Sequence, residues 1–238
     1  MFCGIINMYY YAVYPKERNL NMPSVKVSAS ILNSDLANLG NEIKKACDGG
    51  VDWIHVDVMD GEFVPAISYG SSVQASIAPY AQKPVLIDTH LMVMHPQKQI
   101  SAFAAAKSDI ITFHIESDCD PAAVIDEIHA LGVKAGIAVK PKTPAEAVLP
   151  YLDKVEMVLV MTVEPGLGGQ SFMHDMLDKI RIIREKANAM GKDIDIQVDG
   201  GINAQTSALV KEAGANVLVA GTYHYRAEDM KTAADAMR

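Results

Sequence analysis

The most constraining feature of this 238-residue chain is a regular alternation of short β-rich segments and helical patterns, which begins at Val25. Parallel strands need a crossover connection, usually a helix, so this alternation predicts a parallel sheet. Eight strand–helix units follow one another without a break in composition, which favours a single α/β domain closed into a (β/α)8 TIM barrel over an open doubly wound sheet. The strands are expected at residues 25–30, 53–58, 85–91, 109–114, 134–139, 157–161, 194–198 and 216–220.

The helix boundaries are indicated by residues that start or stop helices. Asp120 offers a side chain that can cap a helix opened by Pro121. Gly132, Gly191 and Gly214 each follow a helical pattern and introduce the next strand, which is the usual place of glycine at a helix C-terminus. The helices are expected at residues 35–48, 72–81, 97–105, 121–131, 144–149, 173–190 and 204–213, and from residue 227 to the C-terminus.

Composition and charge bound the class of protein. Half of the residues are apolar, so a folded domain with a sizeable core is expected. A formal net charge of -8 leaves no basic stripe for phosphates, which argues against nucleic-acid binding. Cys3, Cys47 and Cys119 are odd in number and form no Cys-x-x-Cys pair, so a disulfide framework is not expected. No apolar run is long enough to span a bilayer, and a cytoplasmic location is predicted.

Residues 1–24 are predicted to form an extension outside the fold, which leaves residues 25–238 as the catalytic barrel. The segment is apolar and tyrosine-rich as far as Val13, and a proline and charged residues then interrupt it. A signal peptide would place a positive region ahead of its apolar stretch and a small-residue cleavage site behind it. Neither pattern is present, so secretion is not predicted.

A His-Asp pair stands on the second predicted strand. Residues 53–59 alternate in a period of two, which places His55, Asp57 and Met59 on one face. An imidazole and a carboxylate two residues apart on a strand can share one divalent cation. The alternative is an edge strand whose polar face meets the solvent, and this strand alone does not decide between the two.

Two further strands carry the same kinds of side chain at their ends. The third predicted strand ends at His90 and the seventh at Asp199, which precedes a glycine pair. Two imidazoles and two carboxylates suit a transition-type divalent ion, whereas Mg²⁺ or Ca²⁺ would favour oxygen ligands alone. In a closed barrel the C-terminal strand ends converge on one mouth, so His55, Asp57, His90 and Asp199 can form a single site.

Five motifs at predicted strand ends, in order along the chain, carry a family resemblance. They are SASILNSD at residues 28–35, HVDVMDG at 55–61 with FVP at 63–65, HLMV at 90–93, MTVEPG at 161–166 with GGQ at 168–170, and VDGG at 198–201. In these motifs the chain resembles the ribulose-phosphate 3-epimerases, whose close relatives are the allulose-6-phosphate 3-epimerases. The resemblance runs from about residue 25 to residue 238 and implies a barrel of the ribulose-phosphate binding type.

The resemblance implies a metal-dependent epimerase that inverts C3 of a ketose phosphate, with D-ribulose 5-phosphate and D-xylulose 5-phosphate as the expected pair. Asp57 and Asp199 would be the two acid/base groups, because a planar cis-enediolate must lose and regain its proton on opposite faces. One divalent ion, Zn²⁺, Fe²⁺, Mn²⁺ or Co²⁺, would be held by His55, Asp57, His90 and Asp199. A homo-oligomer, dimer or hexamer, is also expected.

The resemblance further implies which residues would contact the sugar phosphate. Three methionines would line the pocket and exclude water, two glycine-containing turns would hold the phosphate, and a third would close over the substrate as a flap. A serine hydroxyl and an imidazole would contact the sugar. The methionines are Met59, Met92 and Met161, and the phosphate turns contain Gly200, Gly201, Gly221 and Thr222. The flap contains Gly166, Gly168 and Gly169, and the two sugar contacts are Ser30 and His90.

Other functions predict different residues. A phosphate-binding barrel decarboxylase or synthase would carry a lysine between acidic residues, and none lies between Asp57 and Asp60. A non-catalytic sugar-phosphate binder would be expected to have lost a ligand. Departures from the usual family pattern at Glu62, Ala66 and residues 223–225 leave D-allulose 6-phosphate open as an alternative substrate.

Some polar residues receive no role in catalysis. His114 and Glu116, after the fourth predicted strand, are interpreted as support at the mouth, and Lys140 as a solvated loop lysine. The histidines on predicted loops and helices need no function; these are His95, His129 and His174.

Overall fold

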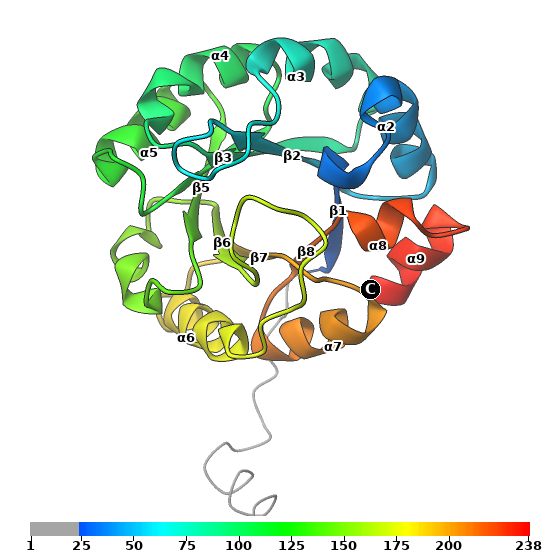
Figure 1. Ribbon diagram of the computed structural model, residues 1–238. Coiled ribbons are helices and arrows are strands. Elements are labelled where there is room, and N and C mark those ends of the chain that lie inside the picture. Colours follow the sequence, from blue (N-terminus) through cyan, green and yellow to red (C-terminus); the bar gives the residue numbers. More distant parts are fainter. Residues whose placement is uncertain (1–23) are drawn as a thin grey trace, which may run out of the picture.

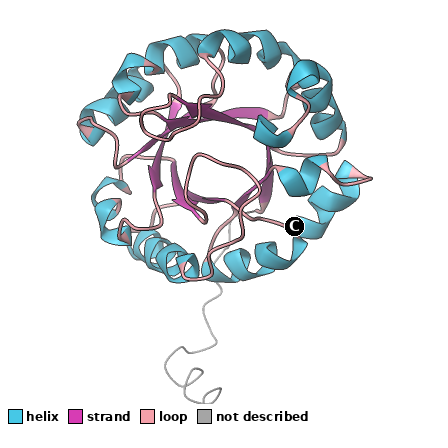
Figure 2. Cartoon of the chain, viewed as in Figure 1, coloured by secondary structure: helices cyan, strands magenta, loops and turns pink. Residues whose placement is uncertain are grey.

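The computed structural model describes residues 24–238, in which eight parallel strands close into one barrel with helices around it (Figure 1, Figure 2). Each strand pairs with the next along the chain, and β8 pairs with β1. The predicted (β/α)8 barrel is therefore confirmed, and every strand lies within one residue of its predicted bounds. The strands are β1 (Lys26–Ser30), β2 (Trp53–Met59), β3 (Leu86–Met92), β4 (Ile110–His114), β5 (Lys134–Val139), β6 (Met157–Met161), β7 (Asp195–Asp199) and β8 (Val217–Ala220).

An apolar layer closes the interior of the barrel where the strands begin. Trp53, Ile110, Met157 and Val217 are the first residues of their strands, and together they form a buried cluster. They come from β2, β4, β6 and β8, the alternate strands that supply one layer in a barrel of this type. Inward-facing positions further along a strand, such as His55 on β2, lie above this layer toward the mouth.

The main hydrophobic core lies between the strands and the surrounding helices. Outward-facing residues such as Val56, Val58 and Leu91 belong to this core, and they are at most 5% exposed. Burial of both sheet faces explains why the strands read as near-continuous apolar runs. The helices are α2 (Leu39–Asp48), α3 (Ser71–Ile77), α4 (Ile100–Ala105), α5 (Pro121–Ala130), α6 (Met176–Ala189), α7 (Ala204–Ala213), α8 (Thr222–Tyr225) and α9 (Met230–Met237).

Short 3₁₀ turns extend or replace several predicted helices. The helix predicted at residues 144–149 is wrong: two 3₁₀ turns stand there, because Pro150 has no N–H to donate into a continuing α-helix. The last helix begins later than predicted, since the Asp229 side chain caps the N–H groups of Lys231 and Thr232. The 3₁₀ turns are η1 (Ile31–Asn33), η2 (Leu36–Asn38), η3 (Ala78–Tyr80), η4 (Pro96–Lys98), η5 (Ala145–Ala147) and η6 (Leu149–Tyr151).

Other predictions about the ends of the elements are confirmed. Asp120 caps α5 by accepting the N–H of Ala122, and Gly132, Gly191 and Gly214 follow α5, α6 and α7 with positive φ angles. Helix α8, a single turn directly after β8, was not predicted.

Two predictions reach the limits of the described chain. The extension predicted at residues 1–24 falls, apart from Ser24, on residues outside the described part. Within residues 24–238, no helix is both long enough and apolar enough to cross a bilayer.

Candidate active site

Three strands bring two histidines and two aspartates together. His55 and Asp57 lie on β2, His90 on β3 and Asp199 at the end of β7. One ligand atom from each of the four lies within 4.8 Å of the others. His55 and His90 are fully buried, whereas the Asp199 side chain keeps 19% exposure. The predicted convergence of these four residues at the barrel mouth is thus present.

A buried carboxylate orients the His55 ring. Nδ1 of His55 lies 2.7 Å from Oδ2 of Asp88, and the Gln197 amide donates to the same oxygen at 2.5 Å. The ionised Asp88 carboxylate can only accept, so Nδ1 of His55 carries the hydrogen. Nε2 of His55 faces Asp57, with 3.2 Å between Nε2 and Oδ1. Burial would lower the pKa of this ring, but the carboxylates of Asp57 and Asp88 outweigh it and raise the pKa well above its ordinary value, so Nε2 is bare only when a cation takes the place of its proton.

His90 is oriented by a second histidine. Nε2 of His90 lies 2.9 Å from Nε2 of His114, whose Nδ1 lies 3.1 Å from Oε2 of Glu116. Burial lowers the pKa of His114 to about 4, outweighing its bond to Glu116, so the ring is neutral at physiological pH. Nδ1 of His90 points the other way, 3.1 Å from Oδ1 of Asp57.

The four side chains fit a divalent metal ion. Nε2 of His55 and Nδ1 of His90 lie 3.3 Å apart, and both face the same Asp57 oxygen. With the other nitrogen of each ring committed to a bond away from the site, lone pairs converge there, and only a cation or protons between them would relieve their repulsion. Two nitrogen and two oxygen donors suit a first-row divalent ion. Asp88 and His114 supply the outer support that metal-binding histidines usually have.

Asp57 and Asp199 have pKa values displaced in opposite directions. Burial alone would raise the pKa of Asp57, but the positive charge and hydrogen bond of a protonated His55 ring, and next the hydrogen bond with His90, outweigh it and hold this pKa below its ordinary range. Burial, and next the charge of Asp57, raise the pKa of Asp199 to about 6. Asp57 thus stays ionised, while Asp199 takes up a proton more readily than an ordinary aspartate does, and this difference suits an acid/base pair.

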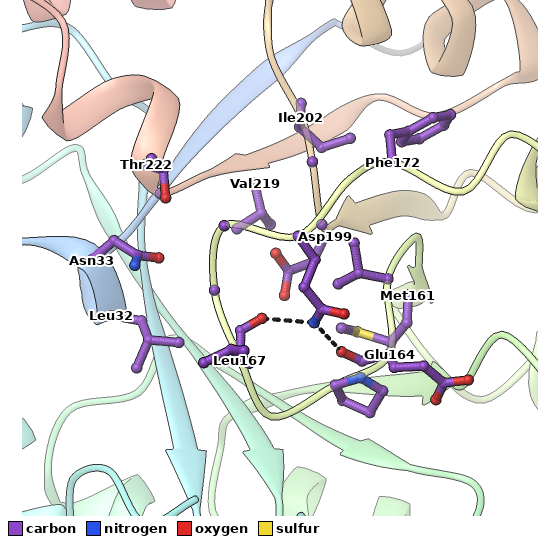
Figure 3. A pocket seen from close by; sticks show the side chains of 18 of the residues that line it. Leu32, Asn33, Met161, Glu164, Leu167, Phe172, Asp199, Ile202, Val219 and Thr222 are labelled. Carbon is purple, nitrogen blue, oxygen red and sulfur yellow. Dashed lines mark hydrogen bonds between the residues drawn. The ribbon is translucent and has the colours of Figure 1, made fainter.

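A cavity of about 510 Å³ opens above these groups at the C-terminal face of the barrel. Asp57, Asp199 and the predicted methionines line it, and Figure 3 shows Asp199 within the pocket, with Asn33 and Thr222 across from Met161. The predicted glycine positions and Thr222 also line the cavity. These are Gly166, Gly168, Gly169, Gly200, Gly201 and Gly221.

The loop after β6 crosses the centre of the barrel mouth in Figure 1. Its turn is held by the Gln170 amide, which donates to the carbonyl oxygens of Glu164 and Leu167 (Figure 3). Leu167 at the tip is 71% exposed. The exposure of this tip is compatible with a loop that can open and close.

The side chains that line the cavity limit how an anion could be bound there. Among the described residues that line it there is no lysine or arginine. Gly201 has a φ of 67°, and a Cβ there would come within 2.5 Å of the Phe172 backbone nitrogen, so only glycine lets these two segments approach. An anion in this cavity would have to be bound largely by backbone N–H groups, and residues 200–201 and 221–222, which line it, are the predicted donors.

The structure places two predicted sugar contacts behind the cavity wall. The Ser30 hydroxyl donates to Oδ2 of Asp57 at 2.7 Å, and His90 is fully buried. Neither lines the cavity; both touch Asp57 instead. Asp88 and Gln197 were not among the predicted site residues, although Asp88 lies two residues before His90 on the same face of its strand. Asn33 and Phe172, which line the cavity, were not predicted either.

The residues without a predicted catalytic role lie in four different settings. His114 and Glu116 support His90 from behind rather than lining the mouth. Lys140 is not a solvated lysine, because its Nζ lies 3.5 Å from the centre of the Phe63 ring and is partly buried. His174 stands at the cavity wall. The remaining two pair with surface carboxylates; they are His95 with Asp118, and His129 with Glu156.

Comparison with known proteins decides the family. Residues 26–225 match the model of the ribulose-phosphate 3 epimerase family. The chain belongs to this family. A ribulose-phosphate 3-epimerase of Bacillus subtilis is 45% identical over 215 residues, covering 90% of this chain and 98% of the relative. The ribulose-phosphate 3-epimerase of Methanocaldococcus jannaschii is 43% identical and covers 90% of each chain.

Solved structures share the barrel at low sequence identity. KGPDC from Streptococcus mutans superposes with a TM-score of 0.67 at 14% identity, covering 90% of this chain and 95% of that one. A 3-hexulose-6-phosphate synthase from Salmonella typhimurium gives 0.63 at 20% identity, covering 89% and 96%. These likenesses concern the fold alone, whereas the ribulose-phosphate 3-epimerase relatives favour an epimerase over the decarboxylase or synthase alternative.

Proposed function

We propose that this epimerase-family chain interconverts D-ribulose 5-phosphate and D-xylulose 5-phosphate by moving a proton at C3. The observation that carries the proposal is the pair Asp57 and Asp199, which share one cavity and have pKa values displaced in opposite directions. A reaction that removes a proton on one face and returns one on the other needs such a pair. The names of the related epimerases support this choice of substrate.

The proton transfers balance with these two groups. The ionised carboxylate of Asp57 takes the hydrogen from C3 as a proton, and the electron pair of the C–H bond passes to the C2 carbonyl, which gives a cis-enediolate. The protonated Asp199 then donates its proton to C3 on the opposite face. In the reverse reaction the two groups exchange roles. Ser30, whose hydroxyl donates to Asp57, orients that carboxylate for the transfer.

His55, Asp57, His90 and Asp199 would hold one divalent ion, and Zn²⁺, Fe²⁺, Mn²⁺ and Co²⁺ all suit these donors. When bound, the ion supplies positive charge to the developing oxyanion as a Lewis acid. Asp88 and His114 keep the two rings turned toward that position. The bare ring nitrogens, rather than the N–H groups, then face the site.

The rest of the cavity binds the substrate and excludes water. Met59, Met92 and Met161 present apolar, polarisable sulfur around the planar intermediate. We assign the phosphate to the N–H groups of Gly200, Gly201, Gly221 and Thr222. The loop with Gly166, Gly168 and Gly169 is assigned as the flap that closes over the bound sugar.

Several wider predictions belong to this proposal. We propose that residues 25–238 are the catalytic domain, with residues 1–24 outside it, and that the enzyme acts in the cytoplasm as a homo-oligomer, dimer or hexamer. D-allulose 6-phosphate remains the second candidate substrate, favoured by the departures at Glu62 and Ala66 near the mouth.

The test compares the two sugar phosphates directly. Metal-loaded protein is incubated with D-ribulose 5-phosphate or with D-allulose 6-phosphate, and kcat/KM is measured for each. We expect the pentose phosphate to be the clearly better substrate. A higher kcat/KM for the hexose phosphate, or comparably poor values for both, would overturn the assignment.

A further inference from the structure

A hydrogen-bonded series of three polar side chains, two of them fully buried, leads away from the candidate metal site. It runs from Nε2 of His90 to Nε2 of His114 at 2.9 Å, and from Nδ1 of His114 to Oε2 of Glu116 at 3.1 Å. Oε1 of Glu116 accepts the backbone N–H of Lys140 at 2.8 Å. His90 and His114 are fully buried and the Glu116 side chain is 20% exposed, so water competes little for these bonds.

These hydrogen bonds can run in only one donor-to-acceptor direction if each of the three side chains is to be satisfied. An ionised Glu116 only accepts, so Nδ1 of His114 must carry its hydrogen. The Nε2 of a neutral His114 is then an acceptor, and Nε2 of His90 must donate to it. The hydrogen of His90 is thereby held on the side away from the site, which leaves its Nδ1 bare toward Asp57. A charge two side chains away thus decides which nitrogen of His90 is free to bind a cation.

The far end of this chain is fixed in place. The residues that follow β5 are held by Lys179, whose ammonium donates to the carbonyl oxygens of Lys140, Pro141 and Thr143. Glu116 therefore takes its backbone N–H from a constrained loop. His55 has a simpler arrangement, because the carboxylate of Asp88 accepts its Nδ1–H directly.

We propose that His114 and Glu116 are positioning residues that set the tautomer of His90, and through it the affinity of the site for its divalent ion. The inference rests on the metal site of the proposed function. The two imidazoles would then differ in character. His55 donates its hydrogen bond to a charged carboxylate, which makes its other nitrogen the stronger metal ligand. His90 donates its hydrogen bond to the neutral ring of His114, and only through that ring is it affected by the charge of Glu116.

Substitution of Glu116 gives the sharpest test. In Glu116→Gln the amide oxygen can still accept the Lys140 N–H, but the amide nitrogen then faces His114. A donor at that point reverses the chain, so that Nδ1 of His90 carries a hydrogen into the site. We expect Zn²⁺ and Co²⁺ to bind about 10-fold to 100-fold more weakly, the usual cost of losing an outer partner of a ligand. His114→Gln, whose amide can accept from His90 and donate to Glu116, should keep most of the affinity.

A matched control residue, Glu156, lies at the opposite end of the barrel. Glu156 also lies 3.1 Å from a histidine nitrogen, that of His129, and also accepts a backbone N–H at 2.8 Å, from Ala135. Glu156→Gln therefore removes the same kinds of contact just before β6, far from the strand ends that carry the site. It should leave the metal dissociation constants unchanged.

The measurement is the dissociation constant for each metal, by competition with a chromophoric chelator, together with the visible spectrum of the Co²⁺ form. Thermal unfolding of the metal-free proteins shows whether each variant folds. A wild type that binds neither ion would contradict the proposed metal site itself. Equal affinity in wild type and Glu116→Gln would overturn the positioning role alone. A His114→Gln variant that loses as much affinity as Glu116→Gln would also overturn this role. The proposal requires the direction of the hydrogen bonds from His90 to Glu116, which a glutamine at position 114 can keep, and not the imidazole itself.

Discussion

Asp57 and His90 are register partners on neighbouring strands, and their side chains meet, with 3.1 Å between Oδ1 of Asp57 and Nδ1 of His90. The same register pairs His55 with Asp88 one step closer to the start of the strands. The parallel pairing of β2 with β3 therefore places both a pair of candidate metal ligands, Asp57 and His90, and the carboxylate that supports a third, His55. Changes to these side chains should affect metal binding and catalysis more than folding.

Replacement of one acid/base group should stop epimerisation. Asp199→Asn keeps the size of the side chain but cannot exchange a proton with C3, so we expect kcat to fall on the order of 10²–10⁴-fold or more. Asp178→Asn, which alters only an exposed pair with Arg181, is the control and should retain activity. Near-native turnover in a folded Asp199→Asn protein would contradict the role of this carboxyl group.

Metal removal should abolish activity reversibly. Chelation leaves the converging lone pairs of His55 and His90 without a cation, and we expect activity to return when a first-row divalent ion is added back. Ions that bind only the folded state also stabilise it, so the thermal midpoint should rise with metal concentration. His90→Ala should neither regain activity nor show this rise. Full activity in thoroughly stripped wild-type protein would refute the metal requirement.

Much of the site was predictable because period-two patterns and strand ends report on position in a barrel. The alternation in residues 53–59 was enough to place His55 and Asp57 on the inner face, and closure brought in His90 and Asp199. The outer support was not predictable in this way. Asp88 and His114 touch the ligands only through the register and tilt of neighbouring strands, which no single strand encodes.

The helices were less accurately predicted than the strands. The strand bounds agree to one residue, since both faces are buried and the apolar runs stop where burial stops. Helix starts depend instead on local capping, as at Asp229, and on prolines such as Pro150, which leave 3₁₀ turns where periodicity suggested a helix. The single turn of α8 is too short to show a helical period.

His224 should make the fold sensitive to acid. Burial, and next the charge of Arg238, lower the pKa of its ring to about 4, and neither ring nitrogen has a hydrogen-bond partner within residues 24–238. Between these two pKa values the histidine is protonated in the unfolded chain, whose histidine pKa is near 6.5, but neutral in the folded protein. Stability should therefore fall as pH drops from about 6.5 to 4, by about 3 kcal/mol from this group alone.

The measurement is urea unfolding of wild type and His224→Leu across that pH range. Leucine has no proton to take up, so the difference in unfolding free energy between the two proteins should shift in favour of the variant as pH falls. A difference that stays constant between pH 7 and 4 would show that His224 does not titrate in this way.

The flap should tolerate little change where it meets the first βα turn. A Cβ on Gly168 would overlap Oδ1 of Asn33, so Gly168→Ala should displace either the Asn33 side chain or the flap. We expect kcat/KM to fall on the order of 10-fold to 100-fold with the thermal midpoint nearly unchanged, because the contact is at the mouth rather than in the core. A second substitution, Asn33→Ala, should recover part of the loss.

The control for the flap is Gly70→Ala, where a Cβ would meet nothing within 4 Å. This variant should behave as the wild type. If Gly168→Ala did so too, the flap would not need its close approach to Asn33.

The most direct test of the account is hydrogen exchange at C3 in heavy water. If Asp57 and Asp199 flank the enediolate, the product epimer should carry deuterium at C3, because the group that removes the proton is not the one that returns it. Asp199→Asn should still exchange the C3 hydrogen of the epimer that faces Asp57, without converting it, and Asp57→Asn should do so for the other epimer. A single-carboxylate variant that exchanged both epimers equally, or inverted C3 at a substantial rate, would contradict the two-base mechanism.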